Sequence, residues 1–263
     1  MPQKPKNDTP SVWFLFSENN LAISERSDGI SLPTPEEIIS IEFSREIPVG
    51  ETEGKRYFCA EISTEAPLPE GIVLKDLRSL YGRLDESTYR LAGRAAQILN
   101  WDQTHRFCGR CGAQTYRSQT EFAMICPRCG LTSYPRISPA VIMAVMREDR
   151  ILLGRHKGSE IYSVIAGYVE AGEALEESVK REVMEEVSVQ VGNIRYFGNQ
   201  PWAYSSSLVV AFTADWISGE IREDKVEIAE AHWFSSDSLP SIPRTGSISR
   251  EIIDWFARTH PHG

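Results

Sequence analysis

The residues with the clearest chemical potential are glutamates within residues 167–189, GYVEAGEALEESVKREVMEEVSV. Taken as a helix at about 100° per residue, Glu182, Glu185 and Glu186 span roughly 100° of arc, centred about 90° from an apolar stripe. Arg181 lies four residues before Glu185, close enough in a helix to pair with it. Glu173 lies near the expected helix start, where its charge complements the helix dipole. The stripe repeats every four residues and predicts the face that packs on a core: Leu175, Val179, Val183 and Val187.

Carboxylates that converge beside a core repel one another unless a cation neutralises them. Mg²⁺ and Mn²⁺ prefer oxygen ligands, and magnesium usually completes its shell with water and substrate phosphate. The pattern therefore predicts a Mg²⁺ or Mn²⁺ site that acts on a phosphate ester or a diphosphate, where metals stabilise phosphoryl oxygens and activate water. The alternative is a solvated helix face, the usual fate of a glutamate run. That alternative leaves Arg181 and the flanking glycines, Gly167 and Gly172, without a role.

Four cysteines form a second pattern, C-x2-C-x14-C-x2-C, in CGRCGAQTYRSQTEFAMICPRCG. Each C-x-x-C pair can form a tight knuckle that turns two thiolates toward one point, and the glycine that follows permits the backbone turn. Four thiolates make a closed tetrahedral shell, which predicts one structural zinc ion per chain, bound by Cys108, Cys111, Cys126 and Cys129. A redox C-x-x-C needs only one pair, so two pairs at this spacing disfavour it. Cys59 stands apart and is predicted to be a buried structural thiol.

The cysteine segment is locally basic in a chain whose net charge is -9. Such a net charge argues against broad binding to nucleic acid, but it does not exclude a local basic patch. One interpretation is that these arginines solvate a small module with little core, and the other is that they face phosphate. Five arginines stand against Asp102 and Glu121 here: Arg106, Arg110, Arg117, Arg128 and Arg136.

The rest of the chain predicts the elements that position these groups. Its 263 residues suggest about two domains, and we divide it into residues 1–98, 99–136 and 137–263. Short apolar runs at 11–16, 56–62 and 71–77, broken by Pro, Gly and Ser, predict a small β-rich N-terminal domain. Residues 85–103 predict a helix with Leu91, Ala95 and Leu99 on one face and Asp85 or Ser87 as its cap.

In the last part, residues 140–146 and 150–156 predict neighbouring strands separated by a charged turn. The glutamate-rich helix, strands at 196–202 and 207–217, and a final helix at about 247–258 complete an α/β/α arrangement. The fold class predicted for the whole chain is therefore α+β.

A composition with 41% apolar and 25% charged residues is typical of a globular protein. No apolar run approaches the roughly 18 residues that a membrane span needs. Residues 1–10 have two lysines without an apolar segment after them, which favours a polar chain start over a signal peptide. We therefore expect no membrane partner and a cytoplasmic location.

The glutamate stretch resembles the Nudix box, G-x5-E-x7-R-E-U-x-E-E-x-G-U with U an aliphatic residue. It matches at Gly167, Glu173, Arg181, Glu182, Val183, Glu185, Glu186 and Val189. Ser188 stands where the box has glycine, which lets the helix exit in a left-handed conformation, and serine should tolerate that conformation less well by about 1 kcal/mol. The resemblance implies the Nudix α/β/α sandwich fold.

A β-rich domain, a four-cysteine zinc ribbon and then a Nudix domain resemble the NADH diphosphatases, Nudix hydrolases that also remove NAD caps from RNA. That family has a loop S-Q-P-W-P-F-P-x-S after the box, and this chain departs from it at Asn199, Ala203 and Ser205. The two missing prolines leave the loop less rigid. The resemblance assigns substrate binding to Gln200, Pro201, Trp202, Ala203, Tyr204, Ser205, Ser206 and Ser207.

The same resemblance implies that Glu182, Glu185 and Glu186 bind the catalytic Mg²⁺ or Mn²⁺, helped by the Ala166 carbonyl and by Glu227. Glu186 is expected to be the indispensable carboxylate, as base or as ligand only. The resemblance also implies that the rings of two further residues, Tyr134 and Tyr168, stack on the nicotinamide, with Tyr168 acting across the interface of a homodimer.

The expected activity is hydrolysis of the NAD(H) diphosphate to nicotinamide mononucleotide and AMP, and removal of NAD caps from RNA to leave a 5′-monophosphate. Neither the order of preference between NADH and capped RNA nor the choice between Mg²⁺ and Mn²⁺ follows from the residues. Two alternatives stay open. One is a broader Nudix pyrophosphatase acting on ADP-ribose or dinucleoside polyphosphates. The other is a zinc-ribbon nucleic-acid-binding protein with a decayed Nudix domain.

Overall fold

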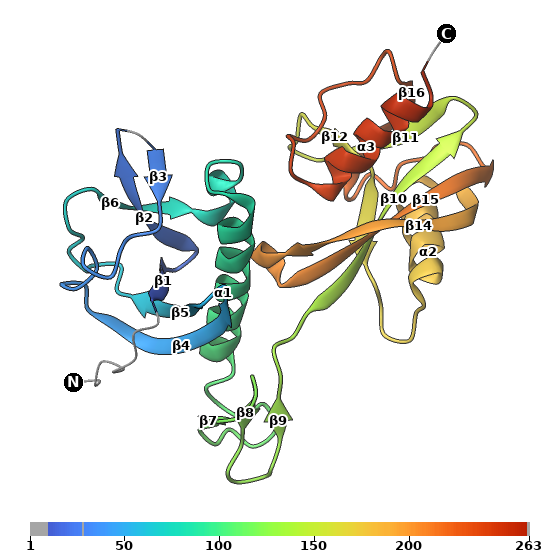
Figure 1. Cartoon of the computed structure of the whole chain (residues 1–263). Coiled ribbons are helices and arrows are strands. Elements are labelled where there is room, and N and C mark those ends of the chain that lie inside the picture. Colours follow the sequence, from blue (N-terminus) through green and yellow to red (C-terminus); the bar gives the residue numbers. More distant parts are fainter. Residues whose placement is uncertain (1–9, 28, 262–263) are drawn as a thin grey trace. The chain divides into compact units, whose positions relative to one another are not determined.

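The computed structural model describes residues 10–27 and 29–261 and divides the chain into two compact units, Met1–Arg136 and Ile137–Gly263 (Figure 1). The polar start expected at residues 1–10 lies, apart from residue 10, outside the described residues. None of the described helices is both long enough and apolar enough to cross a membrane.

The first unit is built around a mixed β-sheet covered by one helix. In the described part of this unit the strand order is β3-β2-β1-β5-β4, with β6 also paired to β2, and β1 runs parallel to β5. The strands are β1 (Ser11–Ser17), β2 (Asn20–Arg26), β3 (Gly29–Ser31), β4 (Phe43–Thr52), β5 (Lys55–Ile62) and β6 (Ile72–Asp76). A short 3₁₀ helix, η1 (Leu77–Leu80), follows β6 and leads toward α1 (Glu86–Thr104), which contacts β1, β4 and β5. The predicted β-rich N-terminal domain is confirmed.

The helix expected at 85–103 is confirmed as α1, and the structure decides its cap. The Asp85 carboxylate accepts a hydrogen bond from the backbone N–H of Thr88 at 2.9 Å, whereas the Ser87 hydroxyl donates to Asp85. The buried face carries Ala95 and Leu99 as expected, while Leu91 is only partly buried.

Cys59 is fully buried in β5, as predicted for a structural thiol. Burial raises the pKa of its thiol to about 12. The side chain is therefore a neutral packing residue with little nucleophilic character.

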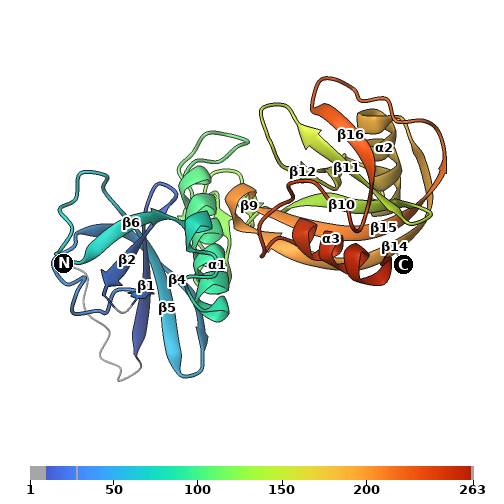
Figure 2. The ribbon, with the colours of Figure 1, turned by 90° about the horizontal axis from the view of Figure 1, so that it is seen from above.

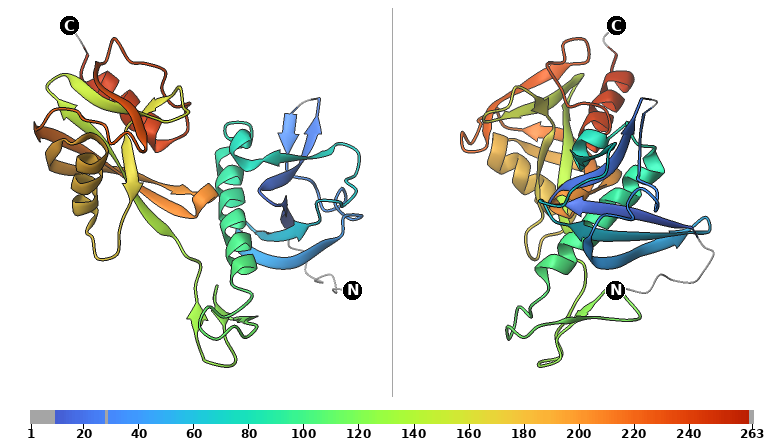
Figure 3. Two further views of the ribbon diagram at one scale, coloured as in Figure 1. Left: turned by 180° about the vertical axis from the view of Figure 1, so that it is seen from behind. Right: turned by 90° about the vertical axis from the view of Figure 1, so that its left-hand side faces the viewer.

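The zinc ribbon follows the C-terminal end of α1 and consists of three two-residue strands, β7 (Tyr116–Arg117), β8 (Met124–Ile125) and β9 (Thr132–Ser133) (Figure 3). Gly112 and Gly130, which follow the two C-x-x-C pairs, have φ of 71° each. Their N–H groups donate to the carbonyls of Cys108 and Cys126. The glycines thus permit the left-handed turn that closes each knuckle.

A fully buried carboxylate ties the ribbon to the rest of the first unit. Asp102 on α1 accepts hydrogen bonds from Arg45 on β4 through one oxygen and from Arg117 on β7 through the other, at 2.8 Å for Arg117 Nη2. Arg45 lies in a β-bulge with φ of 60°, and Arg117 also donates to the Glu46 carbonyl. One buried acid therefore joins three segments that are distant in sequence.

The second unit contains a mixed sheet of order β12-β11-β10-β15-β14, with β13 also paired to β10 and β16 to β11. Strands β10 and β15 run parallel, while β10 and β11, the neighbouring strands predicted from the sequence, pair in antiparallel fashion. The strands are β10 (Ser138–Arg147), β11 (Arg150–His156), β12 (Tyr162–Ser163), β13 (Ile165–Tyr168), β14 (Gln190–Trp202), β15 (Ser207–Ser218) and β16 (Ile228–Ser235).

Two helices, α2 (Leu175–Val187) and α3 (Ile248–Thr259), lie on opposite faces of this sheet (Figure 2). Alternate residues of β10 explain the layers, because successive side chains of a strand point to opposite faces. Val141 and Met143 pack in the cluster that contains Val183 of α2. Ile142 packs in the cluster that contains Ile252 of α3. The predicted α/β/α sandwich, and the α+β class of the whole chain, are confirmed.

Replacing Asp102 by Ala should lower the free energy of unfolding of the first unit by roughly 3 kcal/mol, because two guanidinium groups lose their buried counter-ion. The measurement is the urea midpoint of the zinc-loaded protein. Glu42→Ala, which removes an exposed carboxylate of the same unit, is the control and should leave the midpoint unchanged. A midpoint for Asp102→Ala equal to that of the control would contradict the role given to Asp102.

Candidate functional site

The four cysteines of the ribbon are arranged to bind one metal ion. Their sulfur atoms all lie within 4.8 Å of one another, with Cys108 and Cys129 at 3.6 Å and Cys111 and Cys126 at 3.5 Å. Tetrahedral zinc with Zn–S bonds of about 2.3 Å places its sulfurs about 3.8 Å apart, so the set fits zinc closely. The backbone N–H of Cys129 is the largest influence that lowers the pKa of Cys126, which falls to about 6 and favours the thiolate. The closed four-sulfur shell supports structural zinc.

The glutamates of α2 divide between buried and exposed positions. Glu182 and Glu186 are 9% and 5% exposed, whereas the side chain of Glu185 is 62% exposed. The difference follows from the helical period, because Val179, Val183 and Val187 are fully buried and Glu182 and Glu186 flank them. The predicted apolar stripe is confirmed, with Leu175 partly buried at its start.

The sequence predicted that Arg181 pairs with Glu185, and the structure shows ion pairs with three glutamates. Its guanidinium contacts Glu185 at 3.0 Å, Glu182 at 2.9 Å and Glu173 at 2.5 Å. It also donates to the Tyr168 carbonyl at 3.0 Å. Arg181 is the main cause that lowers the pKa of Glu173, to about 2, so this carboxylate stays ionised. Arg181 therefore connects the end of β13, the following loop and two helical carboxylates.

Gly167 is required by the position of the Glu182 carboxylate. A Cβ atom at residue 167 would lie 2.0 Å from Glu182 Cδ and 2.1 Å from Oε1. Gly167 and Ala166 belong to β13, where Ala166 pairs with Ile142 of β10. The absence of a side chain at 167 lets the helical carboxylate lie against the strand.

Glu186 carries an unusual buried oxygen. Among the described residues, its Oε2 has no hydrogen-bond partner although it is shielded from solvent. Burial, followed by the charges of Glu182, Glu227 and Asp224, raises the pKa of Glu186 to about 8. An orphaned buried acceptor beside further carboxylates is a position that a cation would stabilise.

The carboxylates do not form a tight group of three. Within residues 10–27 and 29–261, the four cysteines form the one group of three or more His, Cys, Asp or Glu whose ligand atoms all lie within 4.8 Å. Magnesium usually keeps several waters in its shell, so it does not require such a tight group of protein ligands.

The loop before β16 positions Glu227 beside Glu186. The backbone N–H of Asp224 donates to the Glu186 carbonyl at 3.0 Å. The Asp224 carboxylate accepts hydrogen bonds from three successive N–H groups, those of Val226, Glu227 and Ile228. Asp224 was not predicted from the sequence. The signal available in the sequence is the residue type alone, because an Asp side chain often accepts hydrogen bonds from backbone N–H groups two residues on.

Ser188 ends α2 in the left-handed conformation that the box glycine would adopt, with φ of 58° and ψ of 31°. Its N–H donates to the Met184 carbonyl. Across from it, a Cβ at Gly219 would lie 2.7 Å from the Ser188 carbonyl oxygen, so the loop before Asp224 packs closely on this exit. The helix exit expected from the resemblance is thus present despite the serine.

The predicted substrate loop covers the end of β14, a 3₁₀ turn η2 (Ala203–Ser205) and the start of β15. Trp202 and Tyr204 form an edge-to-face pair with ring centroids 4.9 Å apart. The side chain of Gln200 donates to the Gly246 carbonyl and accepts from the N–H of Ile248, so it is engaged with the start of α3. The other loop residues on the predicted list are Pro201, Ala203, Ser205, Ser206 and Ser207.

Tyr168 lies beside this loop, whereas Tyr134 belongs to the first unit. The Tyr168 hydroxyl is 3.4 Å from Ser207 Oγ, which is itself 2.9 Å from Ser205 Oγ. Hydrogen bonds from Ser205 and then Ser207 lower the pKa of Tyr168. The Tyr134 ring is exposed, and its hydroxyl donates to Glu121 at 3.5 Å.

Comparisons with known proteins cover nearly the whole chain. The NADH pyrophosphatase-like rudimentary NUDIX domain matches residues 10–101, the NADH pyrophosphatase zinc ribbon domain matches 103–134, and the NUDIX domain matches 136–256.

Two of the curated relatives that bear the name NAD-capped RNA hydrolase NudC illustrate the similarity. The protein of Photobacterium profundum is 48% identical over 179 residues, 67% of this chain and 67% of that protein. The protein of Vibrio vulnificus is 43% identical over 192 residues, 72% of this chain and 73% of that protein. A crystal structure of a NUDIX hydrolase from Nitrosomonas europaea superposes with a TM-score of 0.52 at 21% identity, covering 59% of this chain and 92% of that one, which shows a shared fold.

The raised pKa of Glu186 predicts how stability depends on pH. The protonated form is favoured in the folded state, so its stabilising effect is complete below the ordinary value of 4.5 and is lost as the pH rises through about 8. In zinc-loaded protein without other divalent ions, Glu186→Gln should therefore exceed the wild type in unfolding free energy at pH 8 by more than about 1 kcal/mol.

The difference should shrink toward pH 5, as followed by thermal or urea unfolding across this range. Glu185→Gln is the matched control, because it removes an exposed carboxylate from the same helix. If the difference in unfolding free energy between wild type and Glu186→Gln does not change with pH, the raised pKa of Glu186 is refuted.

Proposed function

This chain belongs to the Nudix hydrolases that carry the NADH pyrophosphatase zinc ribbon, and we propose from that membership that it hydrolyses the diphosphate of NAD(H) to nicotinamide mononucleotide and AMP. On RNA with a NAD cap it would release the mononucleotide and leave a 5′-monophosphate end. The relatives named NAD-capped RNA hydrolase support this substrate class. The structural observation that supports a metal-dependent reaction is the buried Oε2 of Glu186, which has no hydrogen-bond partner among the described residues.

We propose that Glu182, Glu185, Glu186 and Glu227, with the Ala166 carbonyl, hold the catalytic Mg²⁺ or Mn²⁺. Three features of the donor set support this assignment: its ligands are oxygens, two of its carboxylates are buried, and Glu186 Oε2 has no hydrogen-bond partner within the described part of the chain. The bound ions would supply charge stabilisation at the diphosphate oxygens and an activated water.

The protein's own groups would position the substrate and hold these ligands. Arg181 is occupied by three carboxylates and a carbonyl, which assigns it to orienting the ligands and not to contacting substrate. Tyr168 with Ser205 and Ser207 would form one wall of the nucleotide site, and Trp202 with Tyr204 would supply ring surface. Gln200 is hydrogen-bonded to the backbone at the start of α3 and would thereby fix the start of this loop.

Stacking on the nicotinamide by Tyr134 and Tyr168 remains part of the proposal, as does a homodimer in which Tyr168 acts across the interface. A cytoplasmic location is proposed too, because four thiols that serve as metal ligands need a compartment that keeps them reduced.

Ala203 and Ser205, in place of two prolines, favour a second candidate within the same chemistry: a broader pyrophosphatase acting on ADP-ribose or dinucleoside polyphosphates. Without the two proline rings, more backbone conformations are open to the loop. A nucleic-acid binder with a decayed catalytic domain is disfavoured, because all the box glutamates and Arg181 are present.

The decisive experiment is a substrate panel of NADH, NAD, ADP-ribose, diadenosine compounds and NAD-capped RNA, with products resolved by mass. We expect nicotinamide mononucleotide from NAD(H) and from capped RNA. Glu186→Gln should lower turnover by at least about 10²-fold, because a metal ligand or base is lost, while the fold is retained. Equal rates on ADP-ribose and NADH would favour the broader enzyme, and full activity of Glu186→Gln would refute the assigned site.

Gly167→Ala should weaken metal activation while leaving the fold intact. The new methyl group overlaps the Glu182 carboxylate, whose flexible end can move aside at little cost in stability. We expect the Mg²⁺ concentration for half-maximal activity to rise by about tenfold, with a melting temperature within a few degrees of wild type. Gly198→Ala, in β14, controls for the loss of a glycine, because an added Cβ there meets only an ordinary van der Waals contact, Ile248 Cδ1 at 3.6 Å. Unchanged Mg²⁺ dependence in Gly167→Ala would contradict this role.

A further inference from the structure

The zinc ribbon carries arginines of two kinds. Arg117 is bound to Asp102 and to the Glu46 carbonyl, so it holds the ribbon in place. The remaining four are exposed, and no carboxylate of the described residues forms an ion pair with them: Arg106, Arg110, Arg128 and Arg136. Their guanidinium groups are therefore available to a ligand from outside the chain.

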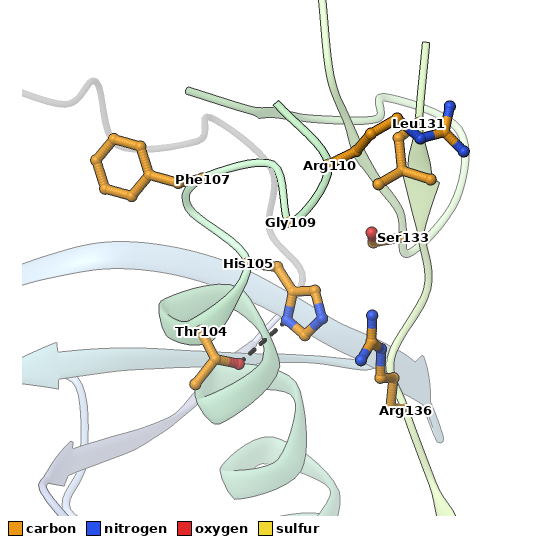
Figure 4. Close-up of a pocket in the computed structure, with 8 residues that line it drawn as sticks. All are labelled: Thr104, His105, Phe107, Gly109, Arg110, Leu131, Ser133 and Arg136. Carbon is orange, nitrogen blue, oxygen red and sulfur yellow. Dashed lines mark hydrogen bonds between the residues drawn. The ribbon is translucent and has the colours of Figure 1, made fainter. Parts of the chain in front are cut away.

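Two of these arginines line an open hollow of about 570 Å³ on the first unit. Arg110 comes from the first cysteine knuckle, and Arg136 comes from the segment after β9 (Figure 4). The knuckle fixes Arg110, because its backbone N–H lies 3.4 Å from Cys108 Sγ. The hollow thus presents two cations, one of which is carried by a cysteine knuckle.

His105 and Ser133 add neutral hydrogen-bonding groups to the same hollow. His105 Nδ1 lies 2.9 Å from the Trp101 carbonyl, so Nδ1 donates to this oxygen and Nε2 stays available to a ligand. A ribose 2′-hydroxyl both donates and accepts hydrogen bonds, so it is a suitable partner for Nε2. This group favours RNA over DNA as the occupant.

Phe107 supplies a ring at the edge of the hollow. Its side chain is 65% exposed, and Figure 4 shows it pointing away from Arg110 and Leu131. One exposed phenylalanine is unremarkable by itself. Phe107 and the two arginines line the same hollow, and cations combined with a stacking ring are what binds single-stranded nucleic acid.

Net attraction contributes little here, so the placement of the groups has to account for binding. Zinc with four thiolates carries a formal charge of about -2, and the whole chain has a net charge of -9. Long-range attraction of a polyanion is therefore weak, and affinity should come from a few direct contacts. Such contacts discriminate between ligands more than a uniformly basic surface does.

We propose that Arg110, Arg136 and Phe107 bind the single-stranded RNA that follows the NAD cap, with the guanidinium groups on two phosphates and the phenyl ring on one base. The RNA identity of the ligand rests on the proposed function. These three residues would strengthen the binding of capped RNA. They would have no role in the binding of free NADH, although both substrates are hydrolysed at the same active site.

Binding is tested with the zinc-loaded full chain and a ten-nucleotide RNA that has a 5′-monophosphate, measured by fluorescence anisotropy. The double variant Arg110→Ala, Arg136→Ala should weaken binding tenfold or more and reduce the slope of log K against log salt by about 1.4, two contacts at about 0.7 each. Phe107→Ala should weaken it about fivefold or more. DNA of the same sequence should bind several times less tightly than the RNA.

Arg90→Ala is the matched control, since Arg90 is an exposed arginine of the same unit, on α1, outside the hollow. Zinc content should stay at one ion per chain in every variant, which separates loss of contacts from loss of the ribbon. Equal affinity of wild type and double variant for RNA overturns the proposal, as does equal affinity of the wild type for DNA.

Turnover supplies the second readout. Arg110→Ala should raise KM for NAD-capped RNA by at least threefold and leave kcat/KM for NADH unchanged. Equal losses on both substrates would assign Arg110 to the fold or the active site and overturn the proposal. If the wild type hydrolyses neither substrate, the proposed function fails, and the anisotropy measurement alone still decides whether this surface binds RNA.

Discussion

The catalytic unit depends on how one guanidinium distributes its hydrogen bonds. Arg181 binds Glu173, Glu182, Glu185 and the Tyr168 carbonyl, and so it joins a strand end, a loop and a helix at one point. These contacts need the strand to approach the helix closely, which the missing side chain at Gly167 permits. One cation cannot neutralise every carboxylate gathered there. The structure therefore keeps an excess of negative charge beside an apolar core, where it is costly unless a further cation binds.

Two buried acids of this chain differ in whether their oxygens are paired. Asp102 is completely buried, and both of its oxygens are used by arginines, so it closes a junction between three segments. Glu186 is nearly as buried, but one of its oxygens lacks a partner among the described residues, and burial together with neighbouring carboxylates raises its pKa. Burial with two partners thus keeps one carboxylate in a fixed position, whereas burial without them favours the protonated form of the other.

Local sequence patterns predicted much of the fold because their signals are short in range. The four-residue period placed Val179, Val183 and Val187 in the core, and the apolar runs located β1, β5, β10, β11 and β15. Strand β4 was not predicted, because Pro48 and two bulges interrupt its alternation. Asp224 was missed since its role depends on a turn packed against the end of α2. The choice of Asp85 over Ser87 as cap also needed the observed backbone.

The sequence by itself determined which chemical groups are present and which of them share a face. The C-x2-C and E-x2-E-E spacings show which groups share a face, because the geometry of a knuckle or a helical turn is set within a few residues. Only the tertiary structure decided which of those groups are already satisfied. It paired Arg117 but not Arg110, tied Gln200 to α3, and left Glu186 with an orphaned oxygen. Partners such as Arg45 for Asp102 come from segments distant in sequence, and burial is set by packing between elements, so neither is visible in a local pattern.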